Sequence, residues 1–200
     1  MALTNCYCSV NELLVHIEST DDMSDKMVAR CEQSINQASR YIDLVTGRVF
    51  YSVTLTSEKV DTFGMSANGL YIDSDRRNVL YSPAPFLSIT SITEDTVALV
   101  NDTDFYQYNP SSGKIGEGKL IKDGGGLWSS DNKAIVITGS IGYATTPWEI
   151  KNICLEVASL IMRAKESFLA NTAGDLVGQM EQVLPKTTMT MLRLLRRKLV

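Results

Sequence analysis

The sequence predicts an α+β protein, in which a small helical bundle carries an antiparallel β-rich insertion. Two observations predict the bundle: apolar residues recur in steps of three and four over residues 9–46 and again over about residues 147–199. A third observation predicts the insertion, because the apolar period changes to two between residues 48 and 143 and turn residues become frequent. Each helical stripe is too apolar to face water alone, so we expect the two stripes to pack together.

The N-terminal part of the chain predicts two helices. Ser9 and Glu12 have the spacing of a capping box, so a short helix is expected to begin after Ser9. Ser24 is the expected start of a longer helix, and Gly47 is its expected end. The longer helix has one apolar stripe, made of Met27, Val28, Cys31, Ile35, Ala38, Tyr41, Ile42 and Val45.

The insertion predicts a series of short strands separated by turns rich in Gly, Asn, Asp, Ser and Pro. Strands this short, with turns this frequent, favour an antiparallel sheet or a small barrel. The expected strands cover residues 49–55, 59–63, 69–72, 78–81, 86–93, 96–100, 105–109, 119–121 and 134–142.

The second helical stretch begins with a second capping box, formed by Thr146 and Glu149, and Pro147 suits the first helical position. The helix is expected to run to about Ala170, with an apolar face made of Ile150, Ile153, Cys154, Val157, Leu160, Ile161, Ala164, Phe168 and Leu169. A weaker helix is expected over residues 175–183, and Pro185 is expected to end it. The predicted organisation is therefore a helical core of residues 1–47 and 144–185, the insertion at 48–143 and a tail at 186–200.

Composition is that of an ordinary soluble globular chain, with 44% hydrophobic and 21% charged residues. No run of 18 apolar residues predicts a membrane span, and the first residues are not expected to be a signal peptide. Of the four cysteines, Cys31 and Cys154 fall on apolar helix faces, which predicts buried thiols in a reducing compartment.

Several short patterns resemble catalytic or ligand sites, but each fits a structural role better. Residues 113–120 match part of a phosphate-binding loop, yet Leu120 stands where the pattern needs Ser or Thr. Cys6 and Cys8 are too close in sequence for a usual zinc pair, and His16 is the single histidine. We therefore expect a protein that is not an enzyme, without catalytic, cofactor-binding or metal-binding residues.

The charge is unevenly placed, which points to a partner for the tail. Residues 186–200 carry five bases and no acid, which leaves 14 bases and 23 acids elsewhere, a net charge of −9. Such a tail suits a nucleic acid, an anionic membrane or a protein groove, and its many leucines favour the protein groove. The simpler alternative is a C-terminal helix folded on its own core. The predicted partner-binding residues are Met189, Met191, Leu192, Arg193, Leu195, Arg196, Arg197, Lys198 and Leu199.

The order of these elements resembles the head-to-tail connector, or head-completion adaptor, family of tailed bacteriophages, which also occurs in gene transfer agents. The resemblance rests on four segments in order. They are the helix end Ile42–Phe50 with its Thr-Gly-Arg turn, the strand and proline segment Val79–Ile92, the hairpin Asp104–Ile115 and the strand Ile135–Tyr143 that leads into Pro147.

This resemblance implies a structural virion protein, assembled in the host cytoplasm and located in the neck of the particle. Members form a ring of twelve subunits, bind the portal through the C-terminal segment and present a surface to the next neck or tail protein. Viral DNA passes through the ring without sequence-specific binding, and an acidic lumen would repel its phosphates. No cofactor and no membrane are implied.

The tail is then expected to be mobile in the isolated subunit and to become ordered on the portal. The alternatives are a protein that binds a small ligand in the β insertion and a protein that binds DNA through the basic tail.

Overall fold

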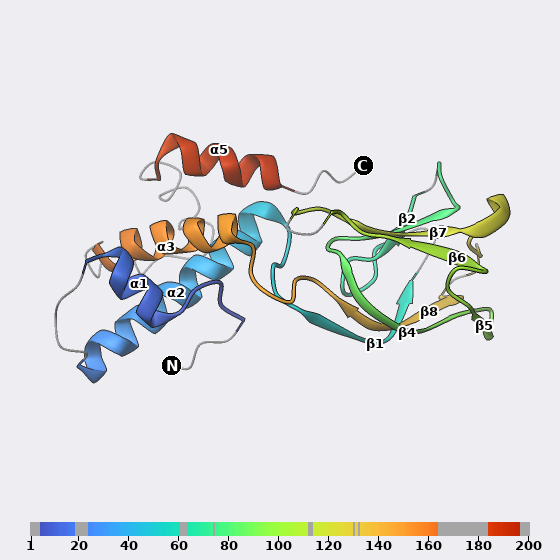
Figure 1. Ribbon diagram of the computed structural model, residues 1–200, viewed down its shortest axis with the longest axis horizontal. Helices are drawn as coiled ribbons and strands as arrows, with labels where there is room; N and C mark the ends of the chain where they lie inside the picture. The colour runs from blue at the N-terminus through green and yellow to red at the C-terminus, as the bar shows by residue number, and fades with distance from the viewer. Residues whose placement is uncertain are drawn as a thin grey trace. The chain divides into compact units, whose positions relative to one another are not determined.

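The structure is a computed structural model that describes residues 5–18, 24–60, 64–73, 75–111, 114–129, 131, 133–163 and 184–196. The chain divides into two compact units: Met1–Tyr51 with Thr146–Val200, and Ser52–Thr145. The second unit begins and ends within a few residues of the predicted insertion at 48–143. The described α-helices fall in the first unit and the described strands in the second, so the predicted α+β class is confirmed (Figure 1).

In the first unit, helix α1 (Val10–His16) and helix α2 (Asp25–Thr46) begin and end where the sequence predicts. The Ser9 hydroxyl accepts from the Glu12 amide at 3.3 Å, and Glu12 Oε2 accepts from the Ser9 amide at 2.8 Å, which completes the capping box. The Ser24 hydroxyl accepts from the Met27 amide. Gly47 ends α2 in the left-handed region at φ 63°, where its missing Cβ avoids strain.

Helix α3 (Trp148–Arg163) lies against α2, and helix α5 (Lys186–Leu195) completes the described helices. Arg30 on α2 donates to the Met162 carbonyl of α3 at 2.9 Å, and the Ser39 hydroxyl lies 3.6 Å from Cys154 Sγ. The predicted packing of the two apolar stripes is therefore confirmed as far as Arg163. The rest of the predicted stripe and the helix predicted at 175–183 lie outside the described residues.

The second unit consists of two four-stranded antiparallel sheets. The first has the order β1-β8-β4-β5, and its strands are Val53–Val60, Ile135–Ile141, Phe86–Glu94 and Val97–Leu99. The second has the order β2-β3-β7-β6, and its strands are Tyr71–Ile72, Val79–Ser82, Gly118–Lys122 and Phe105–Tyr108.

Strand β1 joins residues 53–55 of the strand predicted at 49–55 to residues 59 and 60 of the strand predicted at 59–63, which corrects the prediction of two strands, and residues 61–63 lie outside the described residues. The register of β1 against β8 shifts between Leu55 and Glu58, and Ser57 has a positive φ of 50°. An extra residue of this kind makes a β-bulge that bends the strand without ending it. The sequence shows the bulge only as a break in the alternation of apolar residues, which resembles a turn.

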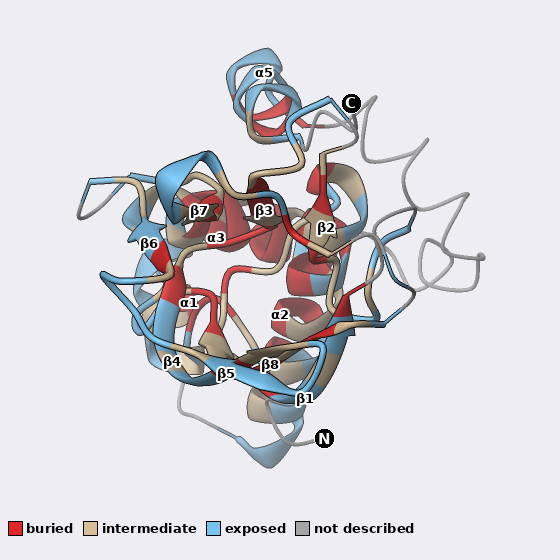
Figure 2. Cartoon of the chain, turned by 90° about the vertical axis from the view of Figure 1, so that its right-hand side faces the viewer, coloured by how far each residue is buried: buried red, intermediate tan, exposed pale blue. Residues whose placement is uncertain are grey.

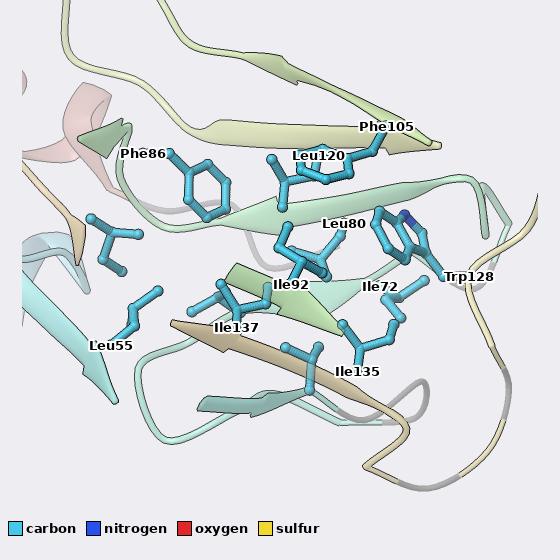
Figure 3. Close-up of a cluster of buried hydrophobic side chains, with 13 residues drawn as sticks. Leu55, Ile72, Leu80, Phe86, Ile92, Phe105, Leu120, Trp128, Ile135 and Ile137 are labelled. Atoms are coloured by element: carbon cyan, nitrogen blue, oxygen red, sulfur yellow. The ribbon is translucent and has the colours of Figure 1, made fainter. Parts of the chain in front are cut away.

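The core of this unit fills the space between the two sheets (Figure 3). Alternate residues of each strand point inward, as the period of two requires. The buried side chains are Leu55, Val60, Leu70, Ile72, Leu80, Phe86, Ile92, Phe105, Leu120, Trp128, Ile135, Ile137 and Ile141. Lys122 bonds the Glu94 carboxylate at the edge of this core, and its Nζ lies 5.3 Å from the centre of the Trp128 ring.

Gly139 on β8 shows how closely the central strands approach each other. A Cβ at this position would lie 2.3 Å from the Ser88 carbonyl oxygen on β4, well inside van der Waals contact. Only glycine fits here without moving one of the strands.

Candidate partner-binding surface on helix α5

Helix α5 makes up most of the part of the predicted tail that the structure describes. It follows Pro185, which cannot continue a preceding helix but provides the first carbonyl of the next one, since the Met189 amide donates to the Pro185 oxygen at 3.1 Å. The helix continues to Leu195, and Arg196 follows it in an extended conformation. The segment 184–196 contains basic residues and no acid.

One face of α5 packs on the other helices of its unit, and Figure 2 shows this buried face in red. Thr188, Met189 and Leu192 are buried on this face. The Tyr41 hydroxyl of α2 donates to Met189 Sδ at 3.7 Å, and the Thr188 hydroxyl donates to the Glu156 carboxylate of α3.

This packing corrects part of the sequence interpretation. Met189 and Leu192 were predicted to contact a partner, but they are 5% and 0% exposed and belong to the core of their own unit. The expectation that residues 186–200 order only on a partner likewise differs from the structure, in which 186–195 form a packed helix. For these residues the alternative of a C-terminal helix folded on its own core describes the structure better.

The opposite face of α5 is exposed and combines apolar with basic residues. Met191 is 49% exposed and Leu194 is 80% exposed, although both are large apolar side chains. Lys186 and Arg193 are exposed on the same helix, and Arg196 is exposed just after it. A charged and apolar helix face of this kind suits a protein groove with acidic residues on its rim. We refer to Met191, Arg193, Leu194 and Arg196 as the α5 outer face.

Of the predicted partner-binding residues, Met191, Arg193 and Arg196 lie on this outer face, and Leu195 is half-buried. Arg197, Lys198 and Leu199 lie outside the described residues. Leu194 was not among the predicted contact residues, although at 80% it is more exposed than Met191 at 49%. The sequence does indicate a second apolar stripe that contains Leu194, because Met189 and Leu192 form one stripe at a spacing of three and Met191 and Leu194 form another.

The other short patterns of the sequence have structural roles. The segment resembling a phosphate-binding loop ends within strand β7, and a short 3₁₀ turn at Asp123–Gly125 follows that strand instead of the helix that a phosphate loop needs. His16 is exposed at the end of α1. Within the described ranges no group of three or more His, Cys, Asp or Glu residues converges to hold a metal ion.

The β unit offers a second exposed surface, on the outward side of its second sheet. Strand registers place Tyr71, Tyr81, Lys119 and Tyr108 in one row across β2, β3, β7 and β6. The rings of Tyr71 and Tyr81 stack with centres 5.1 Å apart, and Lys119 Nζ lies 5.2 Å from the centre of the Tyr81 ring. The row therefore presents phenol edges and an ammonium group, which is the chemistry of a protein contact rather than of a deep ligand pocket.

In the described part of the chain, no helix has the length and apolar character needed to span a bilayer.

No protein-family model matches the sequence, and no curated protein sequence matches it. A solved structure does match in fold: a chain in the neck of an empty GTA particle, computed with C6 symmetry. The two are 14% identical, the match covers 100% of this chain and 94% of the other, and the TM-score is 0.58. The fold of this chain, with both its units, is thus the fold of a protein found in a particle neck.

Proposed function

We propose that this chain is a structural, non-enzymatic subunit of the neck of a phage-like particle. The observation that carries the proposal is the fold match over the whole length of the chain to a protein from the neck of a GTA particle. The order of sequence elements supports the same proposal independently, because four segments between Ile42 and Pro147 resemble those of the head-to-tail adaptors.

In this proposal the subunits form a ring, with twelve copies as the resemblance implies. The ring lies between the portal and the next neck or tail protein, and DNA passes through it. The charge of the chain supports such a passage: the residues outside the tail carry a net charge of −9, which disfavours tight binding of phosphates to the body of the protein.

The α5 outer face, together with residues 197–199, is the proposed portal contact. Its apolar residues supply area to bury, and its basic residues favour encounter with an acidic partner. Leu194 is central to this contact because it is 80% exposed, so a partner that covers it removes much apolar surface from water.

The test is to locate the chain in particles and to measure its assembly state. Particles carrying an epitope tag on this chain are imaged by electron microscopy with a gold-labelled antibody, and the mass of isolated neck complexes is measured by native mass spectrometry. Label at the neck and a mass that is a multiple of the subunit support the proposal. A chain missing from purified particles contradicts it.

The alternatives predict different results for the isolated protein. A DNA-binding protein would be retained on heparin with an affinity that falls steeply as salt rises. A small-ligand protein needs an internal pocket, and the space between the two sheets is filled by Trp128, Phe86, Phe105 and their neighbours (Figure 3). The packing thus favours the structural role over the ligand-binding one.

A further inference from the structure

Two buried thiols face each other between the N-terminal segment and helix α3. Cys8 Sγ lies 3.4 Å from Cys154 Sγ, although 146 residues separate them in sequence. Cys8 is 6% exposed and Cys154 is 0% exposed, and both are free cysteines. The other two cysteines have different neighbours: Cys31 Sγ lies 3.8 Å from Met162 Sδ, and the Cys6 thiol donates to the Asn36 side chain.

We propose that Cys8 and Cys154 are a disulfide-forming pair, which closes when the folded chain meets thiol-oxidising surroundings and ties its N-terminal segment to α3. The sulfur atoms of a disulfide are about 2.0 Å apart, so the two atoms must approach by roughly 1.4 Å. Movement of this size lies within the reach of a side-chain rotation combined with a small backbone shift.

The surroundings of the pair distinguish the two sulfurs. The Cys8 thiol donates to Cys154 Sγ, and this hydrogen bond lowers the pKa of Cys154 while it raises the pKa of Cys8, which burial raises further. The Ser39 hydroxyl lies 3.6 Å from Cys154 Sγ and donates its proton to the Ile35 carbonyl at 2.9 Å. The hydrogen bond between Cys8 and Cys154 joins the two thiols as long as the segment before α1 is closed.

The reaction needs an oxidant, and a low-molecular-weight disulfide such as oxidised glutathione suffices. Either protein thiol, as its thiolate, attacks one sulfur of that disulfide, forms a mixed disulfide and releases one small thiol. The other protein thiol then loses its proton and attacks the protein sulfur of the mixed disulfide, which releases the second small thiol. Two protein thiols are oxidised to one disulfide, and the small disulfide is reduced to two thiols.

The oxidant reaches Cys154 only when the segment before α1 opens. Noncovalent contacts hold this segment closed: Arg40 donates to the Asn5 carbonyl at 2.8 Å, and the Tyr7 amide donates to the Ser39 hydroxyl at 3.2 Å. Tyr7 also donates its hydroxyl to Asp43 and accepts from the Phe50 amide at 3.0 Å. A Cys8–Cys154 bond makes this closure covalent and closes a long loop of the chain.

The use of such a bond rests on the proposed function. A particle assembled in a reducing cytoplasm and then released passes into oxidising surroundings. The N-terminal segment would be able to move away from α3 while the two thiols are free. The disulfide would hold the segment against α3 once the particle is outside the cell. The disulfide itself is tested on the isolated chain, so failure of the neck proposal and failure of this inference are separate results.

The experiment oxidises the folded full-length chain with oxidised glutathione, quenches with acid, blocks the remaining thiols and maps peptides by mass spectrometry. A single linked peptide pair that contains Cys8 and Cys154 is expected, and a reductant should reverse it. The melting temperature of the oxidised chain should rise by roughly 10 °C, because closing a long loop restricts the unfolded state.

The Cys8→Ser and Cys154→Ser variants should lose both the linked peptides and the rise in melting temperature, whereas the control variant Cys31→Ser should keep them. If a variant does not fold, the peptide map of the wild-type chain still decides. The inference is overturned if Cys8 and Cys154 remain open to alkylation after oxidation, if Cys6 is linked instead, or if the reaction stops at a mixed disulfide.

Discussion

Lys151 on helix α3 lies with its Nζ 2.7 Å from Glu12 Oε1 on helix α1, across 139 residues of sequence. The same glutamate completes the capping box with Ser9 through its other oxygen, Oε2. One carboxylate thus caps a short helix and joins that helix to the central helix of the unit.

This arrangement predicts a specific dependence of stability on pH. The hydrogen bond from Lys151, aided by those from Ser9, holds the pKa of Glu12 below its usual 4.5, against a smaller opposing effect of burial. The folded pKa is lower than the unfolded one, so the stabilisation is fully present above about pH 4.5 and is lost as pH falls through the folded pKa. Because both side chains are more than a third exposed, solvent screening limits the effect to about 1 kcal/mol or less.

The check is urea unfolding of Glu12→Gln beside wild type from pH 7 to pH 3. The variant should be less stable at pH 7, and the difference should narrow as pH falls below 4.5. Glu18→Gln is the control, because Glu18 is exposed just after the same helix. A difference that stays constant over the pH range would show that the glutamate carboxylate does not act through its charge.

Ile161 should be a major contributor to the α2–α3 core. It is 2% exposed on α3, and replacement by alanine removes buried methylene groups and leaves a cavity. The expected loss is about 2–5 kcal/mol of unfolding free energy, measured by chemical denaturation. Leu160 is half-buried, so Leu160→Ala should cost less, and the exposed Asn152→Ala should change little. Equal effects of all three variants would contradict this packing.

Gly139→Ala should destabilise the β unit. The added methyl group meets the Ser88 carbonyl oxygen, so strands β4 and β8 must separate or shift. Overpacking of this kind costs about 1–3 kcal/mol, and thermal unfolding should show the loss. Thr138→Ala, at the neighbouring half-buried position of β8, is the matched control. A variant at position 139 as stable as the control would mean that the strands are farther apart than described.

Substitutions on the buried face of α5 should affect the stability of the subunit, whereas substitutions on its exposed face should affect assembly. Leu192→Ala should lower the melting temperature, because Leu192 is fully buried in its unit. Met191→Asp combined with Leu194→Asp should leave the melting temperature nearly unchanged, since both side chains are exposed, but should impair attachment to portal-bearing heads. The measurements are thermal unfolding of the subunit and the yield of DNA-filled particles.

Val15→Asp is the control for the second variant, because Val15 is a large apolar residue that is 79% exposed on another helix. Loss of attachment in this control as well would indicate a general surface effect. Full attachment of the double variant would place the portal contact elsewhere. Deletion of residues 186–200 should destabilise the subunit, because it removes the buried Thr188, Met189 and Leu192.

The sequence predicts those parts of the fold that local interactions determine. Ser9, Ser24 and Gly47 mark helix ends because a cap involves only neighbouring residues. The strands are likewise predicted nearly in place, because alternation is a local pattern. Two strands were predicted where the bulge at Ser57 interrupts one, since one extra residue breaks the alternation without breaking the strand.

The candidate surfaces were harder to predict because they depend on contacts that are distant in sequence. Both apolar stripes of residues 186–195 are visible in the sequence, but only packing against Tyr41 and Glu156 decides which one is buried. The row of Tyr71, Tyr81, Lys119 and Tyr108 needs the strand registers, and the approach of Cys8 to Cys154 spans most of the chain.

The pairing of β1 with β8 bears on how this protein could have evolved. Val53 and Ile141, near the two ends of the β unit, are direct antiparallel partners. The chain therefore enters and leaves this unit at adjacent positions. A segment whose ends already meet adds little loop-closure entropy to the chain that receives it. Gain, loss or exchange of the whole β unit between Tyr51 and Thr146 would therefore change the loop-closure entropy of the helical unit only slightly.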